Sequence, residues 1–189
     1  MTNEPHYFIA IPLKERHKEY YSKWQFDLKE ELPYKQWANK EDLHITLKFL
    51  GSVESNKLNQ LLNYLNVLEK TNEFKIATGS LGFFGNPKKP RVLWVGVDKT
   101  SALAALHHDV EDVSVSAGFE KDRRPFSPHI TLAKKWNGEE VSMSGLKEQY
   151  DNDERLDLIV NQVIVYRIFP ARTPKYEVVA AYELKGEVD

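Results

Sequence analysis

The sequence contains no cysteine among its 189 residues. Disulfide bonds, thiolate nucleophiles and cysteine-ligated zinc sites are therefore excluded. It also lacks a Gly-x-x-x-x-Gly-Lys loop for cradling phosphates and a serine-centred nucleophile elbow. Any catalytic chemistry must therefore come from histidine, acidic, basic or hydroxyl side chains.

Long apolar runs and a strong excess of one charge are also absent. With 41% hydrophobic and 29% charged residues and a mean hydropathy of −0.54, the composition is that of a soluble globular protein without a membrane span. The net charge of −2 argues against a long footprint on duplex nucleic acid, whereas a small anion or an RNA end needs only a local basic pocket. The polar amino terminus shows no signal pattern, so a cytoplasmic location is expected.

The tetrapeptide His-Ile-Thr-Leu occurs twice, at residues 44–47 and 129–132. In a β-strand alternate side chains share one face, so each histidine lies beside the threonine two residues later while isoleucine and leucine point to the core. If the two halves of the chain pack as related lobes, both His-Thr pairs face one cleft. Duplication of a core strand would explain the repeated isoleucine and leucine, but not the outward histidine and threonine.

The predicted elements around the two tetrapeptides follow the same order. We expect strands at residues 7–13, 43–50, 74–84, 91–97, from 129, 156–169 and 176–184, and helices at 14–32, 55–69, 100–117 and 141–150. This order predicts an α+β fold with two pseudo-symmetric lobes, each an antiparallel sheet with helices on its outer face, enclosing a central cleft. We expect a single bilobal domain over residues 1–189, with approximately duplicated halves and a junction near residues 85–91.

Two histidines on opposite sides of one phosphate can open a cyclic phosphodiester with water. One imidazole deprotonates the water and the other protonates the departing oxygen, and an unperturbed pKa of about 6.5 suits histidine to both roles. The threonine hydroxyls on the same strand face can donate hydrogen bonds to the non-bridging oxygens as negative charge builds.

These motifs resemble the two His-x-Thr-x motifs of the two-histidine (2H) phosphoesterases. More closely, the chain resembles the bacterial RNA 2′,3′-cyclic phosphodiesterases, historically called 2′-5′ RNA ligases. The resemblance covers nearly the whole chain and includes residues 8–11, 43–51, 91–97, 124–133 and 176–178.

The resemblance implies hydrolysis of an RNA-terminal 2′,3′-cyclic phosphate to a 2′-phosphate, without a metal or another cofactor. By motif position, His44 would be the proton donor to the departing O3′ and His129 the proton acceptor that activates water. Thr46 and Thr131 would hold the phosphoryl oxygens. The partners expected are RNA ends or small cyclic-phosphate nucleotides, with no membrane and no obligate protein partner, so the protein should be a monomer.

Three further residues are candidates for substrate binding. The family often has arginine at the position of Lys134. Lysine keeps the positive charge but lacks the planar guanidinium that makes a two-pronged contact. Phe49 can stack on a terminal base or simply pack within its strand. Arg124, in the basic loop before His129, can steer an anionic substrate or be an ordinary solvated side chain.

Three alternatives stay open on the sequence alone. The same site can run the reverse reaction and join RNA through a 2′-5′ bond, or it can bind RNA ends without catalysis. A metal site built on the motif histidines is disfavoured because only Asp42 adjoins a motif. His107 and His108 lie about 100° apart on a predicted helix, which favours a solvated helix face over a shared ligand site.

Overall fold

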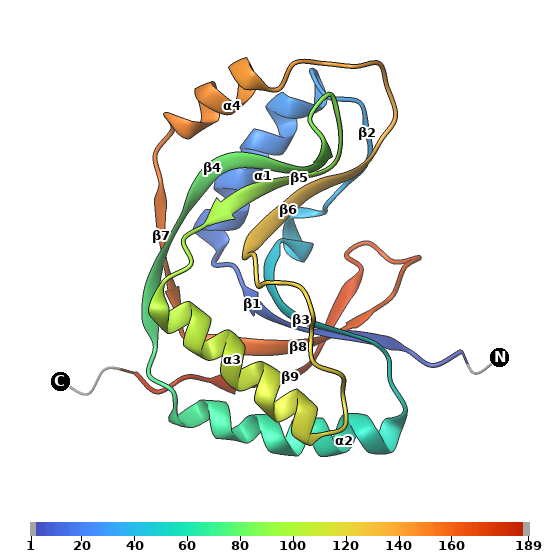
Figure 1. Cartoon of the computed structure of the whole chain (residues 1–189), viewed down its shortest axis with the longest axis vertical. Helices are drawn as coiled ribbons and strands as arrows, with labels where there is room; N and C mark the ends of the chain where they lie inside the picture. Colours follow the sequence, from blue (N-terminus) through green and yellow to red (C-terminus); the bar gives the residue numbers. More distant parts are fainter. Residues whose placement is uncertain (1–2, 187–189) are drawn as a thin grey trace.

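In the computed structural model, which describes residues 3–186, nine β-strands form one open sheet with four α-helices packed on it (Figure 1). The strands are β1 (His6–Pro12), β2 (Tyr34–Trp37), β3 (His44–Ser52), β4 (Phe74–Asn86), β5 (Lys89–Val97), β6 (His129–Trp136), β7 (Leu156–Val160), β8 (Gln162–Ile168) and β9 (Tyr176–Glu183). The helices are α1 (Glu15–Lys29), α2 (Ser55–Tyr64), α3 (Ser101–Ser116) and α4 (Ser144–Asp151), with short 3₁₀ helices η1 (Lys40–Asp42) and η2 (Leu65–Lys70). The predicted α+β class is confirmed.

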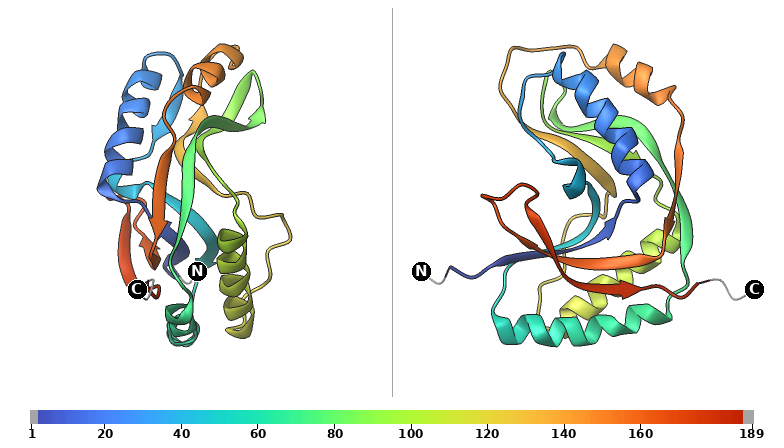
Figure 2. Two further views of the ribbon diagram at one scale, coloured as in Figure 1. Left: turned by 90° about the vertical axis from the view of Figure 1, so that its left-hand side faces the viewer. Right: turned by 180° about the vertical axis from the view of Figure 1, so that it is seen from behind.

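The sheet narrows in the middle. Its strand order is β7-β4-β5-β6-β3-β1-β8-β9, with β2 added beside β6, and the pairings between these strands are antiparallel. Between β3 and β6 the register holds a single pair, Ile45 with Ile130. We therefore distinguish an upper sub-sheet (β7, β4, β5, β6 and β2) from a lower sub-sheet (β3, β1, β8 and β9), joined at the β3–β6 seam (Figures 1 and 2).

The two sub-sheets do not correspond to the two halves of the sequence. The segment near residues 85–91, predicted as the junction between the halves, is the turn of the β4–β5 hairpin inside the upper sub-sheet. In the same way β8, from the second half, pairs with β1 in the lower sub-sheet. The order β4-β5-β6 thus repeats as β8-β1-β3. Strands β2 and β4 of the first half lie in the upper sub-sheet, and β8 and β9 of the second half lie in the lower one.

Helices cover the outer face of each sub-sheet (Figure 2). On the upper one, Trp24 of α1 packs on Tyr150 of α4 with ring centroids 4.7 Å apart, and Gln25 Nε2 donates to the backbone oxygen of Leu132 at 3.0 Å. On the lower one, α3 buries the regularly spaced apolar side chains that predicted it, at Leu103, Leu106 and Val110. The inner faces of the two sub-sheets are left to form the walls of a cleft.

Three elements differ from the sequence prediction. The strand expected at 156–169 is two strands, because the chain passes at Asn161 from the edge of the upper sub-sheet into the lower one. The helix expected at 55–69 tightens into 3₁₀ geometry at Leu65. The four-residue strand β2, beside β6, was not predicted. Within residues 3–186, no helix combines the length and apolar character needed to cross a membrane.

Candidate functional site

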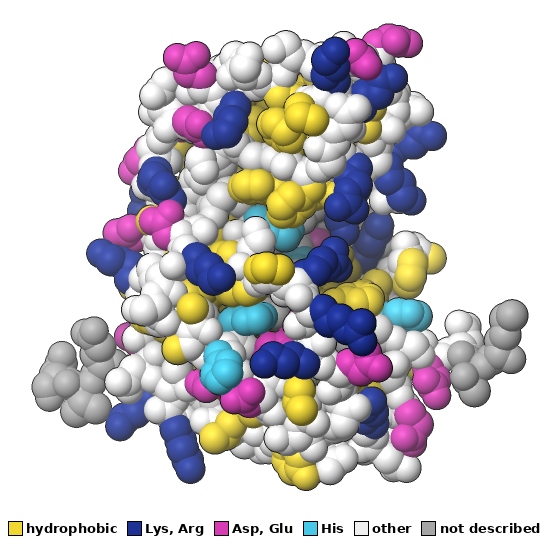
Figure 3. Space-filling view, viewed as in Figure 1, with side chains coloured by type: hydrophobic (Ala, Val, Ile, Leu, Met, Phe, Trp, Pro, Cys, Tyr) yellow, Lys and Arg dark blue, Asp and Glu magenta, His cyan; other side chains and the backbone are white. Residues whose placement is uncertain are grey.

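The two His-Thr motifs meet at the seam between the sub-sheets. Ile45 and Ile130 pair directly and are fully buried. Because the strands are antiparallel, the histidine of each lies beside the threonine of the other, on the face opposite the isoleucines. Histidines in this diagonal relation are about 7–8 Å apart between Cα atoms. That separation leaves room for one phosphate group between the two rings, and Figure 3 shows histidine side chains recessed in the hollow between the sub-sheets.

Both imidazoles are oriented by the same local hydrogen bond. Nδ1 of His44 lies 2.7 Å from the backbone oxygen of Asp42, and Nδ1 of His129 lies 2.7 Å from that of Ser127. A carbonyl oxygen can only accept, so Nδ1 carries the hydrogen and the lone pair of the neutral ring is on Nε2. Thr46 Oγ1, 2.9 Å from Nε2 of His44, is therefore the donor in that contact. Each ring presents the atom that can accept or return a proton.

Asp42 fixes the start of β3, a role that the sequence did not reveal. Its buried carboxylate accepts from the backbone amides of Lys175 at 2.8 Å and Tyr176 at 3.2 Å. The carboxylate thereby joins the residue whose carbonyl orients His44 to the start of β9 and the residue before it. Its oxygens are engaged with amides rather than turned toward the imidazole.

The ring of His44 lies among aromatic side chains of the lower sub-sheet. Phe8 of β1 is 4.7 Å away between ring centroids, Tyr176 of β9 is 5.4 Å away, and Tyr166 of β8 is 6.3 Å away. These rings remove water from three sides of the imidazole. Burial also raises the pKa of Tyr166 to about 12, so this phenol stays neutral and can act only as a hydrogen-bonding group near pH 7.

The ring of His129 has the corresponding neighbours in the upper sub-sheet. Phe84 of β4 is 5.0 Å away and Trp94 of β5 is 6.0 Å away. The indole of Trp94 lies flat across Gly82, where an added Cβ would overlap its six-membered ring. Gly82 therefore allows the close approach that brings Trp94 against the histidine.

Without bound substrate, both His44 and His129 are mainly neutral at pH 7. The pKa of His44 is lowered to about 4, first by burial and then by the charges of Lys134 and His129, against the hydrogen bond to Asp42, which raises it. The pKa of His129 is also lowered, first by burial and then by Lys134, against its hydrogen bond to Ser127. A negative charge placed between the rings would raise both pKa values, because it favours the imidazolium form.

Two β-bulges bring Lys134 and Phe49 to the histidine face. Each residue is the fifth after its motif histidine, an odd spacing that regular alternation would place on the opposite face. The register shifts by one residue between β3 and β1 and between β6 and β5, in both cases just after the His-Thr pair. The extra residue of a bulge reverses the alternation of side chains. The exposed Phe49 side chain and the Lys134 side chain therefore lie on the same face of the sheet as the histidines and threonines.

The basic candidates differ in position. Lys134 lowers the pKa of both histidines, and its own pKa is lowered by burial and by the charges of Lys175 and Lys135. This gathers cationic groups of β6 and of the loop before β9 beside the histidine pair. Arg124 lies exposed in the loop that precedes β6. Between residues 3 and 186 it makes no side-chain hydrogen bond, ion pair or ring contact.

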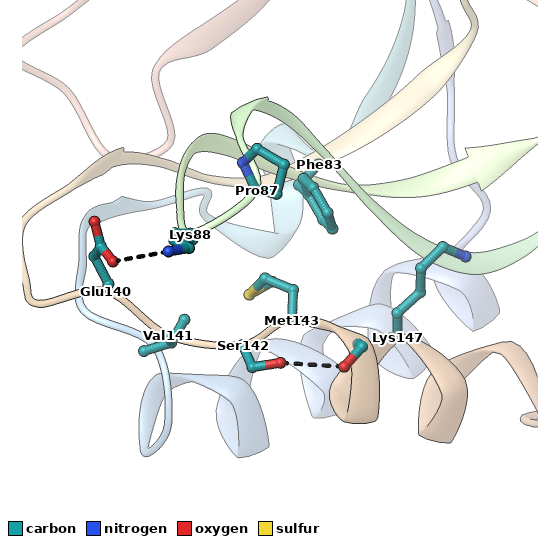
Figure 4. Close-up of a pocket in the computed structure, with 9 residues that line it drawn as sticks. Phe83, Pro87, Lys88, Glu140, Val141, Ser142, Met143 and Lys147 are labelled. Atoms are coloured by element: carbon teal, nitrogen blue, oxygen red, sulfur yellow. Dashed lines mark hydrogen bonds and ion pairs between the residues drawn. The ribbon is translucent and has the colours of Figure 1, made fainter.

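Two other features of the molecule lie away from the histidine face. Among the described residues, the grouping spaced for a metal ion is His107, Glu111 and Asp122, behind β3. A cavity of about 510 Å³ opens between the β4–β5 hairpin and the segment before α4 (Figure 4). Phe83, which lines it, is next to Phe84 in β4 and so points to the opposite face of the strand. The predicted site residues do not line this cavity.

Comparisons with known proteins identify the family of the chain. The family model described as 2′-5′ RNA ligase superfamily matches residues 13–168. Two curated relatives named RNA 2′,3′-cyclic phosphodiesterase are similar over nearly the whole chain. The protein from Geobacillus stearothermophilus is 40% identical over 97% of this chain and 59% of its own length, so this chain spans under two thirds of it. The protein from Bacillus subtilis is 30% identical over 95% of this chain and 97% of its own length.

Solved structures share the fold. The crystal structure of E. coli LigT complexed with 3′-AMP aligns with a TM-score of 0.77 at 22% identity, over 96% of this chain and 99% of that one. The crystal structure of TT0787 of Thermus thermophilus aligns with a TM-score of 0.71 at 21% identity, over 97% of this chain and 100% of that one. At these identities the likeness shows the architecture alone.

Proposed function

The chain belongs to the 2′-5′ RNA ligase superfamily, and on that premise we propose that it hydrolyses RNA-terminal 2′,3′-cyclic phosphates to 2′-phosphates. The observation that supports this most is the pairing of β3 with β6, which turns two His-Thr pairs to one face across a single seam. The names of the two curated relatives agree with the proposed reaction.

In the proposed reaction the cyclic phosphate lies between the two imidazoles. Nε2 of His129 accepts a proton from water while the water oxygen bonds to phosphorus, and the P–O3′ bond breaks on the opposite side. His44 gives its Nε2 proton to the departing O3′, which becomes a hydroxyl. The rings then return to their starting protonation through solvent. Each of these positioned proton transfers is worth about 10²–10⁴ in rate.

The substrate supplies the charge that His44 needs to act as an acid. With a pKa of about 4, His44 is neutral in the unliganded protein, and the bound phosphodiester anion raises that pKa. The carbonyl of Asp42 stabilises the imidazolium through Nδ1. Protonation of Nε2 also frees the Thr46 hydroxyl, which then donates to a phosphoryl oxygen instead. Thr131 and the Lys134 ammonium stabilise the other oxygens as negative charge builds.

The pH dependence follows from the lowered histidine pKa values. The catalytic base must be neutral and the catalytic acid protonated. As pH increases, kcat/KM therefore rises through the lower of the two histidine pKa values and falls through the higher. Both free-protein pKa values lie below 6.5, that of His44 at about 4. We therefore expect an optimum of kcat/KM below pH 6.5 and a higher optimum for kcat, because bound substrate raises both pKa values. A kcat/KM optimum above pH 7 would contradict this assignment.

Lys134 provides a separate prediction. Hydrogen bonds to charged groups contribute about 1.5–3 kcal/mol, so Lys134→Ala should lower kcat/KM by roughly 10–100-fold. Because Lys134 depresses both histidine pKa values, the optimum of kcat/KM should also move to higher pH. Lys134→Arg should keep most of the activity, and Lys135→Ala, in the exposed neighbouring lysine, is the matched control. Equal losses in the Lys134→Ala and Lys135→Ala variants would indicate nonspecific attraction of the substrate.

A short RNA that ends in a 2′,3′-cyclic phosphate, incubated with the protein in excess EDTA, tests the proposed function. We expect a 2′-phosphate product, identified by ³¹P NMR. Complete dependence on an added divalent ion would overturn the mechanism. Adding a second RNA with a free 5′-hydroxyl measures 2′-5′ ligation beside hydrolysis. Tight binding of the 2′-phosphate end without turnover would instead indicate a binding module.

A further inference from the structure

Lys48 is a buried lysine directly behind the first His-Thr pair. It follows Leu47 on β3 and is 2% exposed. The bulge in β3 keeps its side chain on the same face as Leu47, the outer face that α3 covers, away from the histidines. A buried ammonium is costly unless its charge and its three N–H donors have partners.

The partners of Lys48 come from α3 and from the loop that follows it. Nζ lies 2.8 Å from Glu111 Oε1 and 3.3 Å from Asp122 Oδ1, and it donates to the backbone oxygen of Glu120 at 2.9 Å. The second oxygen of Glu111 accepts from the amide of Asp122 at 3.1 Å. Burial would raise the pKa of Glu111, but the hydrogen bonds from Lys48 and Asp122 lower it overall. The Lys48 ammonium thus lies against the carboxylates of Glu111 and Asp122, two of the three residues whose spacing would suit a metal ion.

The loop fixed by this network leads directly to the second catalytic strand. Residues 117–128 contain no helix or strand, so contacts of their side chains with the rest of the molecule hold this loop in place. Beyond the Lys48 contacts, the loop is held by Phe126. Its ring stacks on that of His107, with the ring centroids 3.9 Å apart and an angle of 4° between the ring planes. Its next residue, Ser127, supplies the carbonyl that orients His129.

We propose that Lys48 is a positioning residue for His129. It ties the loop bearing Ser127 to β3, so that the strand carrying one histidine sets the orientation of the other. This inference rests on the proposed function, and it assigns the Lys48 network the role for His129 that the Asp42 carboxylate has for His44. Without the network, the Ser127 carbonyl can shift and no longer fixes the orientation of the His129 imidazole. Catalysis is then impaired, while substrate binding changes little.

The test compares Lys48→Met with the double variant Lys48→Met/Glu111→Gln. The double variant also removes the carboxylate that would be left unpaired, which spares the fold. We expect kcat to fall about 10–100-fold in both, as for a misplaced catalytic group, with KM changed less than about threefold. The matched control is Tyr21→Phe, which removes a similarly buried hydrogen bond, to Thr78 at 2.6 Å, and should leave kcat unchanged.

A second readout does not depend on activity. In ¹⁵N-histidine NMR spectra of the neutral rings, wild-type His129 should be the Nδ1–H tautomer, and both variants should show a mixture at His129 with His44 unchanged. A folded double variant with wild-type kcat and an unchanged His129 tautomer would overturn the proposal. An inactive wild-type protein whose His129 tautomer still responds to Lys48→Met would instead overturn only the proposed function.

Discussion

His44→Ala and His129→Ala should each lower kcat by about 10²–10⁴, the usual worth of a positioned acid or base. In both rings a carbonyl holds Nδ1 and leaves Nε2 for proton transfer, so the loss should appear in kcat. The measurement is steady-state hydrolysis of a cyclic-phosphate RNA. His108→Ala is the control, because this histidine of α3 is exposed and its Nε2 lies 3.2 Å from Asp112 Oδ2 of the same helix.

A modified substrate separates the acid from the base. If sulfur replaces O3′, the departing thiolate has a pKa near 8.5 rather than that of an alcohol, so it needs little protonation. Activity of His44→Ala should therefore recover on this substrate, whereas His129→Ala should stay impaired because water still has to be deprotonated. Recovery in His129→Ala alone would reverse the two roles.

Gly82→Ala should impair both stability and catalysis. The added methyl group would overlap the Trp94 ring, and overpacking of this kind costs about 1–3 kcal/mol. The Trp94 and His129 ring centroids are 6.0 Å apart, so displacement of the indole would also leave His129 more exposed to water. We expect a lower Tm in thermal unfolding, a lower kcat, and a His129 pKa closer to its ordinary value.

The matched control for this substitution is Gly145→Ala in α4. A Cβ there meets nothing within 4 Å, and alanine is favoured over glycine in a helix by roughly 0.5–1 kcal/mol. Gly145→Ala should therefore leave kcat unchanged and raise Tm slightly. A Gly82→Ala protein with wild-type Tm and kcat would show that the Trp94 ring can move at little cost.

Local periodicity predicted much of this molecule. The alternation within each His-Ile-Thr-Leu segment placed the isoleucines inward and the polar pairs on one face, and the two buried isoleucines pair at the seam. The apolar spacing of α3 and the turn before β9 were also visible in the sequence. These features depend on neighbours within a few residues, which is why pattern reasoning reaches them.

Features that need a distant partner were not predictable in this way. A spacing of five residues puts Phe49 and Lys134 on the wrong face until pairing with β1 and β5 introduces a bulge. The buried pairing of Lys48 with Glu111 spans 63 residues, and nothing local marks it. The exchange of β4 and β8 between sub-sheets likewise depends on strand pairing, so a repeat in the sequence does not reveal it.

The proposed reaction requires both imidazoles to contact one phosphate group. Titration of the ¹⁵N-histidine-labelled protein with a nucleoside 2′-phosphate, followed by NMR across pH, measures this directly. We predict that saturation raises the pKa of His44 and of His129 together. A rise at only one of the two histidines, or at neither, would contradict a site in which they share a phosphate.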